Sequence, residues 1–277
     1  MQHVEGELPL NETLISEELR TAGYRTYMVG KWHLGYSTPA HLPINRGFDS
    51  FYGYYNGYVD YWTKTYGDYL DLQDGDKIVS DQDEISSSLH NGYLLQRKAE
   101  EAISFHAANH SDSPMFLYYA LQLIHGYWSA PEDYLSRCEF PSTLSDDYVG
   151  SVEYNYCALN VMLDEAIANL TCALKLYGRS DNTVMFIVSD NGGEGTVSGN
   201  SYPFRGHKGS YFRGGITTTA IVHSTSILPE EVRGQSYNGL MHVTGDFPRF
   251  SSSYFSSTST TITSLVYYSI FAAGSGD

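Results

Sequence analysis

The chain has 277 residues, of which 42% are hydrophobic and 17% are charged, so a sizeable core is possible and the composition argues against global disorder. Acidic residues outnumber basic ones 32 to 16, which gives a formal charge of -16. This balance argues against a nucleic-acid-binding surface, which needs a basic stripe. An anionic ligand would need local cations or a metal ion to overcome the long-range field.

Three cysteines are too few for a disulfide scaffold. Cys157 and Cys172 fall in one predicted helix, about 22 Å apart by helical rise, so they cannot pair without breaking it. The simplest expectation is that these two and Cys138 are free thiols in the core, although an odd count leaves open a partner outside this chain.

Three Asn-x-Ser/Thr sequons, each common by chance, together favour a secretory route, either lysosomal or secreted: Asn11, Asn109 and Asn169. The first residues lack the basic and apolar regions of a signal peptide, and no run reaches the ~18 apolar residues of a membrane span. We therefore expect no transmembrane segment and a natural N-terminus that lies further upstream.

The first predicted helix covers residues 11–22, with Asn11 as its N-cap and Gly23 just after its end. A strand from Tyr24 to Val29 follows, and the motif GKWHLG comes directly after it. Lys31 and His33 lie two apart in this motif and can face an anion. The alternative is an exposed loop around a buried tryptophan.

The segment from Gly47 to Tyr69 is rich in tyrosine and too rich in glycine and aspartate for a clean strand or helix. Its aromatic side chains either pack a long loop onto the body of the protein or stack on sugar rings. The sequence therefore marks the loop from Tyr52 to Tyr69 within this segment as a candidate specificity element.

Two further elements precede a single histidine. A helix is predicted within residues 83–109, and an uninterrupted apolar run from Met115 to Leu121 predicts a buried strand. His125 lies just beyond that strand, where it is either structural or catalytic.

The longest helical pattern covers residues 145–177 and is ended by Gly178. The apolar run from Val184 to Val188 then predicts a parallel strand, followed by Asp190, Asn191 and two glycines. Two oxygen donors on a sharp turn suit a hard cation such as Ca²⁺, whereas the ordinary alternative is a surface turn.

Another strand is predicted over residues 216–222, so strands and helices alternate along the chain. This alternation predicts an α/β sandwich with a largely parallel sheet flanked by helices. Residues 249–277 are rich in serine, threonine and tyrosine without a consistent period. They are either a terminal strand, a poorly ordered tail or sequence foreign to the parent fold.

Candidate polar residues follow three predicted strands, and a further lysine lies in the later motif RGHKG. Because ligands bind at the carboxyl ends of parallel strands, these side chains are expected at one edge of the sheet. Two lysines, two histidines and an Asp-Asn pair suit a tetrahedral oxyanion bound to a divalent metal. Spacing alone does not separate sulfuryl from phosphoryl transfer. The candidates are Lys31, His33, His125, Lys208, Asp190 and Asn191.

Several stretches resemble the type I sulfatases, and most closely the arylsulfatase B-like branch. GKWHLG followed by SDNGG is a specific pair of motifs, and the matches come in family order. They are Leu8 to Gly35, Arg46 to Tyr54, Met115 to Leu135, Ala158 to Leu174, DNTVMFIVSDNGG and RGHKGSYFRGG.

The resemblance implies an alkaline-phosphatase-like fold, a sulfate ester substrate on an aryl group or a glycosaminoglycan-type glycan, and one Ca²⁺. It implies that Asp190 and Asn191 are metal ligands. Lys208 and His125 would stabilise or protonate the leaving oxygen, His33 would assist the nucleophile, and Lys31 would hold nucleophile and sulfate.

The family nucleophile is a formylglycine made from the cysteine of Cys-x-Pro-Ser-Arg, and no cysteine here stands in that motif. The first two metal-binding aspartates of the family are also absent, and Arg213 and Thr217 depart from the family pattern. We therefore expect residues 1–248 to be a sulfatase catalytic domain that is incomplete at its N-terminus, without the smaller C-terminal domain.

Two alternatives remain. One is an inactive fragment or relative that binds sulfated glycan, supported by the missing nucleophile motif and the added charge of Arg213. The other is a metal-dependent phosphatase or phosphodiesterase, which would need more histidine and aspartate ligands than Asp190 and Asn191. Oligomeric state is not predicted by any of these patterns.

Overall fold

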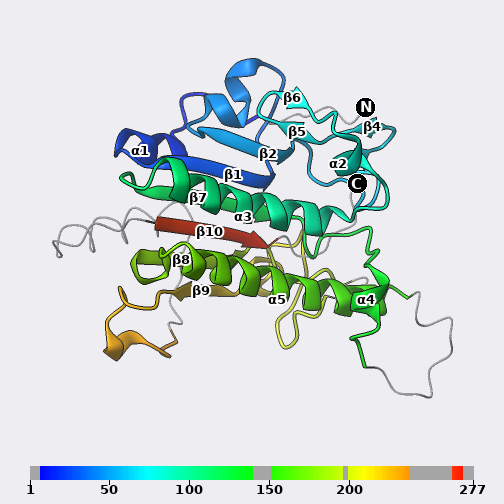
Figure 1. Cartoon of the computed structure of the whole chain (residues 1–277). Helices are drawn as coiled ribbons and strands as arrows, with labels where there is room; N and C mark the ends of the chain where they lie inside the picture. Colours follow the sequence, from blue (N-terminus) through cyan, green and yellow to red (C-terminus); the bar gives the residue numbers. More distant parts are fainter. Residues whose placement is uncertain (1–6, 140–150, 196–198, 237–263, 271–277) are drawn as a thin grey trace.

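The computed structural model describes residues 7–139, 151–195 and 199–236, together with the backbone of residues 264–270. Its centre is an eight-stranded sheet in the order β6-β5-β2-β1-β7-β10-β8-β9 (Figure 1). β2, β1, β7, β10 and β8 run parallel, while β5, β6 and β9 are antiparallel to their neighbours. The predicted α/β sandwich with a largely parallel sheet is confirmed.

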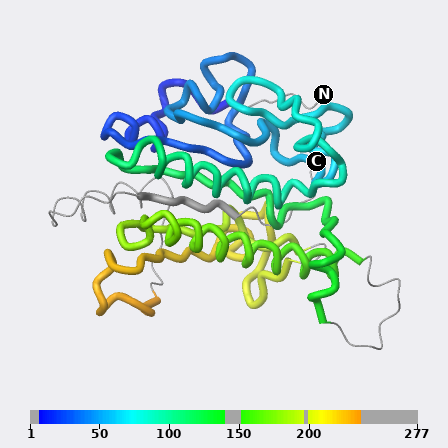
Figure 2. The backbone as a smooth tube through the Cα atoms, in the orientation of Figure 1, coloured from blue at the N-terminus to red at the C-terminus, as the bar shows by residue number. Residues whose placement is uncertain are grey.

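The strands have the following bounds: β1 Arg25–Lys31, β2 Ser50–Tyr54, β5 Gln73–Asp74, β6 Lys77–Ile78, β7 Met115–Leu121, β8 Thr183–Ser189, β9 Ala220–His223 and β10 Ser264–Ile270. A separate two-stranded hairpin pairs β3 Thr65–Tyr66 with β4 Tyr69–Leu70. In the sheet order β10 separates β1, β2 and β7 from β8 and β9. Figure 2 traces the first group of strands, in blue to green, above the second group, in yellow-green to orange.

The two long helices, α3 Asn91–Asn109 and α5 Val152–Leu176, lie side by side on one face of the sheet (Figure 1). Alternate residues of β7, such as Leu117 and Tyr119, are buried in the cluster that includes these helices. Phe116 points into the opposite cluster, where Leu19 of α1 Ile15–Thr21 is also buried. A strand buried on both faces explains why β7 is an uninterrupted apolar run.

The first helix begins later than predicted. Its N-cap is Leu14 instead of Asn11, and the Leu14 N–H donates to Glu17 Oε2 at 2.8 Å, which is one half of a capping box. Asn11 is exposed before the helix, and Gly23 follows its end with φ 89°.

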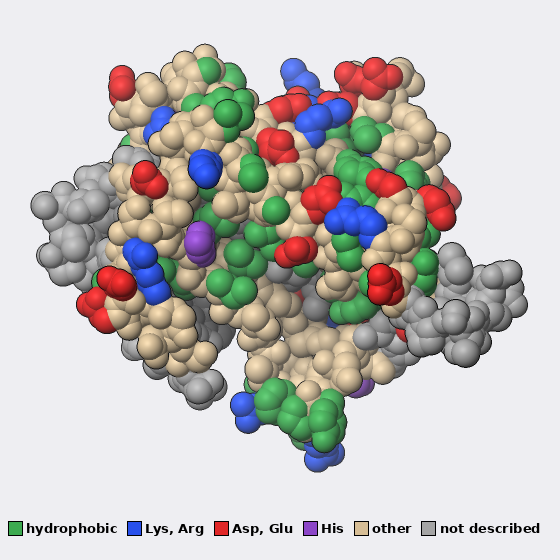
Figure 3. Space-filling view, turned by 60° about the horizontal axis from the view of Figure 1, so that its bottom comes forward, with side chains coloured by type: hydrophobic (Ala, Val, Ile, Leu, Met, Phe, Trp, Pro, Cys, Tyr) green, Lys and Arg blue, Asp and Glu red, His purple; other side chains and the backbone are tan. Residues whose placement is uncertain are grey.

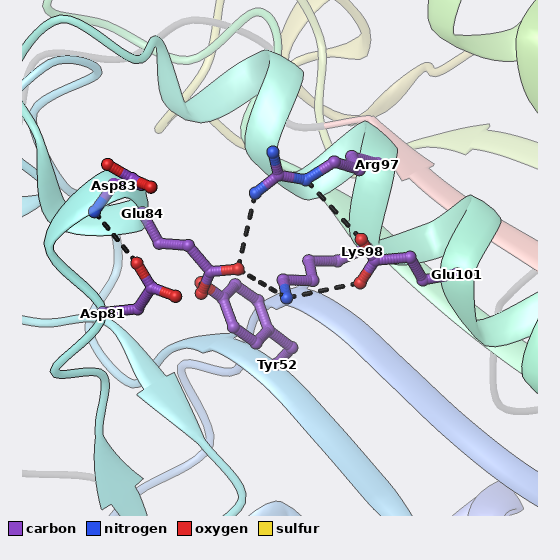
Figure 4. A network of polar contacts seen from close by, with 7 residues as sticks. All are labelled: Tyr52, Asp81, Asp83, Glu84, Arg97, Lys98 and Glu101. Atoms are coloured by element: carbon purple, nitrogen blue, oxygen red, sulfur yellow. Dashed lines mark hydrogen bonds and ion pairs between the residues drawn. The ribbon is translucent and has the colours of Figure 1, made fainter.

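A polar network ties β2 to the short helix α2 Gln82–Ile85 and to α3 (Figure 4). The Tyr52 hydroxyl donates to Glu84 at 2.8 Å, and Lys98 Nζ lies 2.7 Å from the same carboxylate. Arg97 and Glu101 extend the network along α3. The tyrosine-rich segment continues after β2 as the tyrosine-rich loop, residues 55–69, so these contacts help to fix where that loop starts.

Other predicted elements differ in detail. The predicted strand over 216–222 is wrong at its start, since α6 Arg213–Ile216 ends there and β9 begins only at Ala220. The tyrosine-rich segment contains β2, and residues 249–277 contribute β10. Residues 145–150 of the predicted long helix, and residues 249–263 and 271–277, lie outside the described residues.

By length and composition alone α5 is apolar enough to cross a membrane. Its apolar residues Ala158, Met162 and Leu170 are instead buried in the core against the sheet. This packing explains the composition as that of a core helix.

The expectation of free cysteines is wrong for two of the three. Cys138, three residues after α4 Glu132–Leu135, forms a disulfide with Cys157 of α5, and Cys172 is a free and exposed thiol. Helical rise excluded only the pair within α5 and said nothing about a cysteine that α4 brings beside that helix.

Removing this disulfide is expected to lower the free energy of unfolding by about 3 kcal/mol, because it closes a loop between cysteines 19 residues apart. Urea unfolding of the Cys138→Ser/Cys157→Ser variant, followed by circular dichroism, measures the loss. Cys172→Ser is the matched control and should unfold like the parent. An unchanged midpoint in the double variant contradicts the prediction.

Candidate active site

The parallel strands β1, β2, β7 and β8 all end at one edge of the sheet, and candidate residues follow three of them. Lys31 is the last residue of β1, and His33 lies two residues later. His125 follows β7, and Asp190 comes directly after β8. The predicted convergence at the carboxyl edge is therefore what this topology produces.

Lys31 is buried because β1 and its neighbours approach each other closely. Gly30 has φ 106°, and a Cβ there would lie 1.9 Å from the Ala120 carbonyl oxygen of β7. Only glycine fits this position. Lys31 is 9% exposed. The next residue, Trp32, is also buried, which agrees with the predicted alternative of a loop around a buried tryptophan.

His33 is exposed and held by backbone contacts to the chain after β2. Its N–H donates to the Tyr55 carbonyl at 3.0 Å, and its φ is 56°. A Cβ on Gly57 would lie 3.0 Å from His33 Cε1, so the tyrosine-rich loop runs directly against the imidazole.

His125 is buried at 6% exposure beside the same loop. Its N–H donates to the Gln122 carbonyl at 2.8 Å, and its own carbonyl accepts from the Tyr61 hydroxyl at 3.2 Å. The imidazole stacks on Tyr58, with ring centroids 5.8 Å apart and planes at 12°. These contacts fix the position of the ring.

The turn after β8 is packed too tightly to be an ordinary surface turn. Gly192 donates to the Gly215 carbonyl at 2.9 Å, and a Cβ on Gly192 would lie 1.9 Å from the Gly214 oxygen. Asn191 Nδ2 donates to the Gly192 carbonyl at 2.8 Å. Asp190 is exposed at the start of this turn.

Lys208 is brought to the turn by its own backbone, since its N–H donates to the Gly193 carbonyl at 3.0 Å. The ends of the loop that carries Lys208 are joined by a hydrogen bond from the Gly214 N–H to the Arg205 carbonyl at 2.8 Å. The motifs SDNGG and RGHKG therefore form one packed unit.

The charges of the candidate side chains perturb one another. Burial lowers the pKa of Lys31 to about 8, Asp190 opposes this shift and Lys208 adds to it. Burial also lowers the pKa of Lys208, against the effect of Asp190. The pKa of His125 falls to about 3, through burial first and then through Lys208 and Lys31. The pKa of His33 is lowered by partial burial of its ring and by the same lysines.

The structure thus brings Lys31, His33, His125, Lys208 and Asp190 into one electrostatic cluster, with Asn191 next to Asp190 in the turn. Two lysines, one buried and one half-buried, beside histidines with depressed pKa values mark a place that favours a bound anion. This cluster stands out in a chain of formal charge -16. On the face drawn in Figure 3, acidic and basic side chains are interspersed with apolar ones and form no basic stripe.

Asp190 and Asn191 have the hard oxygen donors that Ca²⁺ and Mg²⁺ prefer, but Ca²⁺ takes six to eight of them. Among the described residues there is no group of three or more His, Cys, Asp or Glu side chains placed to hold a metal ion. The donor chemistry fits a divalent cation, whereas the number of donors does not complete its shell.

Two acidic residues were missed by sequence reasoning. Glu194 is buried at 7% exposure and raises the pKa of Lys208 against the effect of burial. Asp71 accepts from the Tyr55 and Asn56 N–H groups at 3.0 and 2.9 Å and so ties down the tyrosine-rich loop. Neither belongs to a motif, and only the folded chain reveals their contacts.

A groove of ≈ 820 Å³ lies between α3 and α5, away from the candidate cluster. Its lining includes Gln96, Glu100 and Cys172, and it contains none of the six candidate residues. The cluster and the groove are therefore separate features.

Comparison with known proteins places these features in a family. The Sulfatase family model matches residues 1–257. Arylsulfatase J of Mus musculus is 34% identical over 249 residues, which are 87% of this chain and 38% of the relative. N-acetylgalactosamine-6-sulfatase of Rattus norvegicus is 30% identical over 228 residues, covering 79% of this chain and 41% of the relative.

Solved structures agree. The crystal structure of Ps i-CgsB in complex with k-i-k-neocarrahexaose has a TM-score of 0.69 and 27% identity, over 80% of this chain and 49% of that one. PsFucS1 sulfatase from Pseudoalteromonas sp. shares the fold, with a TM-score of 0.57 and 20% identity over 80% and 49%. The chain spans about two fifths of the length of the curated relatives it matches. From its family model, its relatives and its fold, this chain belongs to the sulfatase family.

Proposed function

We propose that the protein containing this chain hydrolyses sulfate esters on aryl groups or sulfated glycans, with the sulfate held by the cluster at the carboxyl edge of the sheet. The observation that carries this proposal is the convergence of Lys31 and Lys208 on the buried His125, whose pKa is lowered by burial first and further by the two lysines. A sulfate group placed among them offsets the mutual repulsion of the two ammonium groups. The names of the relatives, an arylsulfatase and an N-acetylgalactosamine-6-sulfatase, support the same chemistry.

The two lysines have the charge needed to stabilise the sulfate oxygens and the leaving oxygen as the S–O bond breaks. His125 lies beside them as the proton donor to the leaving oxygen. Without a ligand its pKa is about 3, so the imidazole is neutral near pH 7. A bound sulfate ester neutralises the lysines and raises that pKa, so a larger fraction of His125 carries the proton to be donated once the substrate is in place.

We assign His33 the role of assisting the nucleophile, on the side of the sulfate from which it attacks. Lys31 is assigned to hold the nucleophile and the sulfate group in place. In the sulfatase family the nucleophilic oxygen is supplied by a formylglycine, whose cysteine motif does not occur in these 277 residues. Asp190 and Asn191 would contribute oxygen ligands to a divalent cation, which we propose is Ca²⁺.

The proposed compartment is lysosomal or extracellular. A disulfide between Cys138 and Cys157 suits an oxidising environment. Asn11 and Asn109 are exposed in their sequons, as glycosylation requires.

Hydrolysis of 4-nitrophenyl sulfate by the full-length protein tests the function. Asp190→Ala is expected to lower kcat/KM by about 10²-fold or more, because it removes a proposed cation ligand and the carboxylate beside Lys31 and Lys208. Asp112→Asn, exposed before β7 at the opposite end of the sheet, is the control and should retain full activity. Full activity in Asp190→Ala refutes the assignment of Asp190.

If the unaltered full-length protein hydrolyses no sulfate ester yet binds inorganic sulfate, the alternative of a non-catalytic binding relative is favoured. Arg213, which carries the extra charge behind that alternative, lies with its guanidinium 4.0 Å from the centroid of the Phe204 ring. Stacking on an aromatic ring gives this arginine a role within its own loop.

A further inference from the structure

A cluster of three tyrosines lies against His125 through the ring of Tyr58. The ring of Tyr58 stacks on the imidazole at 5.8 Å, and the rings of Tyr66 and Tyr127 each lie 5.1 Å from Tyr58 between centroids. Tyr58 is half-buried, whereas Tyr127 is 55% exposed. Tyr58 and Tyr127, here called the tyrosine wall, therefore present aromatic surface to solvent beside His125.

The tyrosine wall also borders His33. Gly57 lies so close to that imidazole that a Cβ there would be 3.1 Å from Nε2, and Tyr58 is the next residue. Asp71 anchors the preceding residues by accepting from the Tyr55 and Asn56 N–H groups. Tyr58 is thus held on a fixed loop between the two histidines of the site, whereas Tyr127 lies two residues after His125 in the loop that follows β7.

Tyr127 adopts a backbone conformation that is unfavourable for a non-glycine residue. Its φ is 64°, in the left-handed region, and this conformation does not bury its ring. Because the strain gains little apolar burial, packing alone is a weak explanation for it. Strained residues of this kind cluster at ligand-binding sites, where the observed conformation presents a side chain.

The hydroxyl groups of the wall are paired and remain polar. Tyr58 Oη lies 3.4 Å from Tyr127 Oη, and the hydrogen bond between them raises the pKa of Tyr58 to about 12. The Tyr58 hydroxyl therefore stays protonated at neutral pH. Aromatic faces with adjacent hydroxyls match a sugar ring, which offers apolar C–H faces and a rim of hydroxyl groups.

We propose that Tyr58 and Tyr127 form a saccharide subsite that holds the pyranose ring carrying the sulfate group, next to His125. This inference rests on the proposed function, since it places the leaving group of the sulfate ester on the side of the proton donor. It narrows the substrate class from aryl sulfates and glycans in general to sulfated sugars. Tyr127 is the residue most exposed to the sugar, and Tyr58 also positions the imidazole.

The test compares equilibrium binding of two probes to the full-length protein by calorimetry. The first is the tightest binder among a panel of sulfated monosaccharides that includes N-acetylgalactosamine 6-sulfate, and the second is inorganic sulfate, which fills only the sulfate position. Tyr127→Ala is expected to weaken sugar sulfate binding at least tenfold and to leave inorganic sulfate within about twofold, in line with the worth of one aromatic contact. Tyr177→Ala, at the exposed end of α5, should change neither.

Two further variants keep the result interpretable. Tyr127→Gly accepts the left-handed backbone without strain, so it preserves the loop if the alanine variant misfolds, and it should lose the same affinity. Tyr127→Phe keeps the stacking surface and should retain most of the affinity.

The subsite is overturned if no sugar sulfate binds more tightly than inorganic sulfate, or if both Tyr127→Ala and Tyr127→Gly bind it normally. Hydrolysis is measured separately. A protein that binds sugar sulfates through Tyr127 but does not cleave them refutes the proposed hydrolase and leaves the subsite standing. Loss of affinity for both probes in Tyr127→Ala and Tyr127→Gly indicates a damaged sulfate position and also overturns it.

Discussion

Replacing Lys31 with methionine is expected to lower kcat/KM for 4-nitrophenyl sulfate in the full-length protein by about 10²–10³-fold, the loss typical of one preorganised charge-stabilising group. Methionine has a similar length and fits the buried end of β1, so the packing beside Gly30 is preserved. The lost ammonium group no longer offsets charge on the sulfate. Steady-state kinetics at pH 7 measures the effect.

The same substitution has a second expected signature. Lys31 contributes to the low pKa of His125, so its removal should raise that pKa in the ligand-free protein, which NMR titration of the imidazole detects. Lys77→Met, on the exposed edge strand β6, is the matched control and should change neither kinetics nor titration. Normal kinetics in Lys31→Met contradicts the role of Lys31 in sulfate binding.

Lowering the pH from 7 to 4 is expected to destabilise the fold by about 3 kcal/mol for each of two buried histidines, His90 and His106. Burial lowers the pKa of both to about 4 from the ordinary value of 6.5. Between pH 6.5 and 4 the two histidines are therefore protonated in the unfolded chain but largely neutral in the folded chain, which favours unfolding. The contribution of the two neutral histidines to stability is fully present above pH 6.5 and is lost as the pH falls toward 4.

Burial is the main cause of the low pKa of both rings, and the hydrogen bond to Nδ1 of His90 adds to the preference for the neutral form. His90 Nε2 faces the Ser129 carbonyl at 3.0 Å, while its Nδ1 accepts from the Gly92 N–H at 3.2 Å. His106 Nε2 likewise faces the Ser113 carbonyl at 3.1 Å, and its Nδ1 lies 3.2 Å from the Tyr27 hydroxyl. A proton on Nδ1 of His90 would oppose the Gly92 N–H, because the nitrogen could no longer accept.

Urea unfolding at several pH values measures this dependence. His106→Gln should flatten the fall in stability between pH 6.5 and 4, whereas His223→Gln on the exposed strand β9 should leave it unchanged. A stability that stays constant over this range in the parent protein contradicts the prediction.

Some of this architecture could be read from the sequence because the relevant signals are local. The apolar runs that became β7 and β8 are bounded by loops, and β7 is buried on both faces while β8 is buried over its first three residues, so their composition alone marks them. Lys31, His33, His125 and Asp190 come just after or at the end of strands. Parallel pairing was enough to predict that they share one edge.

Features that depend on distant contacts could not be predicted in this way. The disulfide between Cys138 and Cys157 depends on how α4 meets α5, which no spacing rule fixes. For the tyrosine-rich loop the sequence allows two roles, packing onto the body of the protein or stacking on sugar rings. Only the stacking of Tyr58 on His125 places this loop at the site. β10 has no distinctive period and was one of three alternatives for its segment.

The position of β10 has a consequence for how the protein forms. β7 and β8 do not pair with each other, and each pairs in parallel with β10, with Ser264 opposite both Met115 and Thr183. The ribosome makes residues 264–270 after both flanking strands, so the two parts of the sheet have open edges until this strand arrives. Such late, long-range closure makes folding slow and leaves nascent chains prone to aggregation, and it gives chaperones a defined interval in which to act.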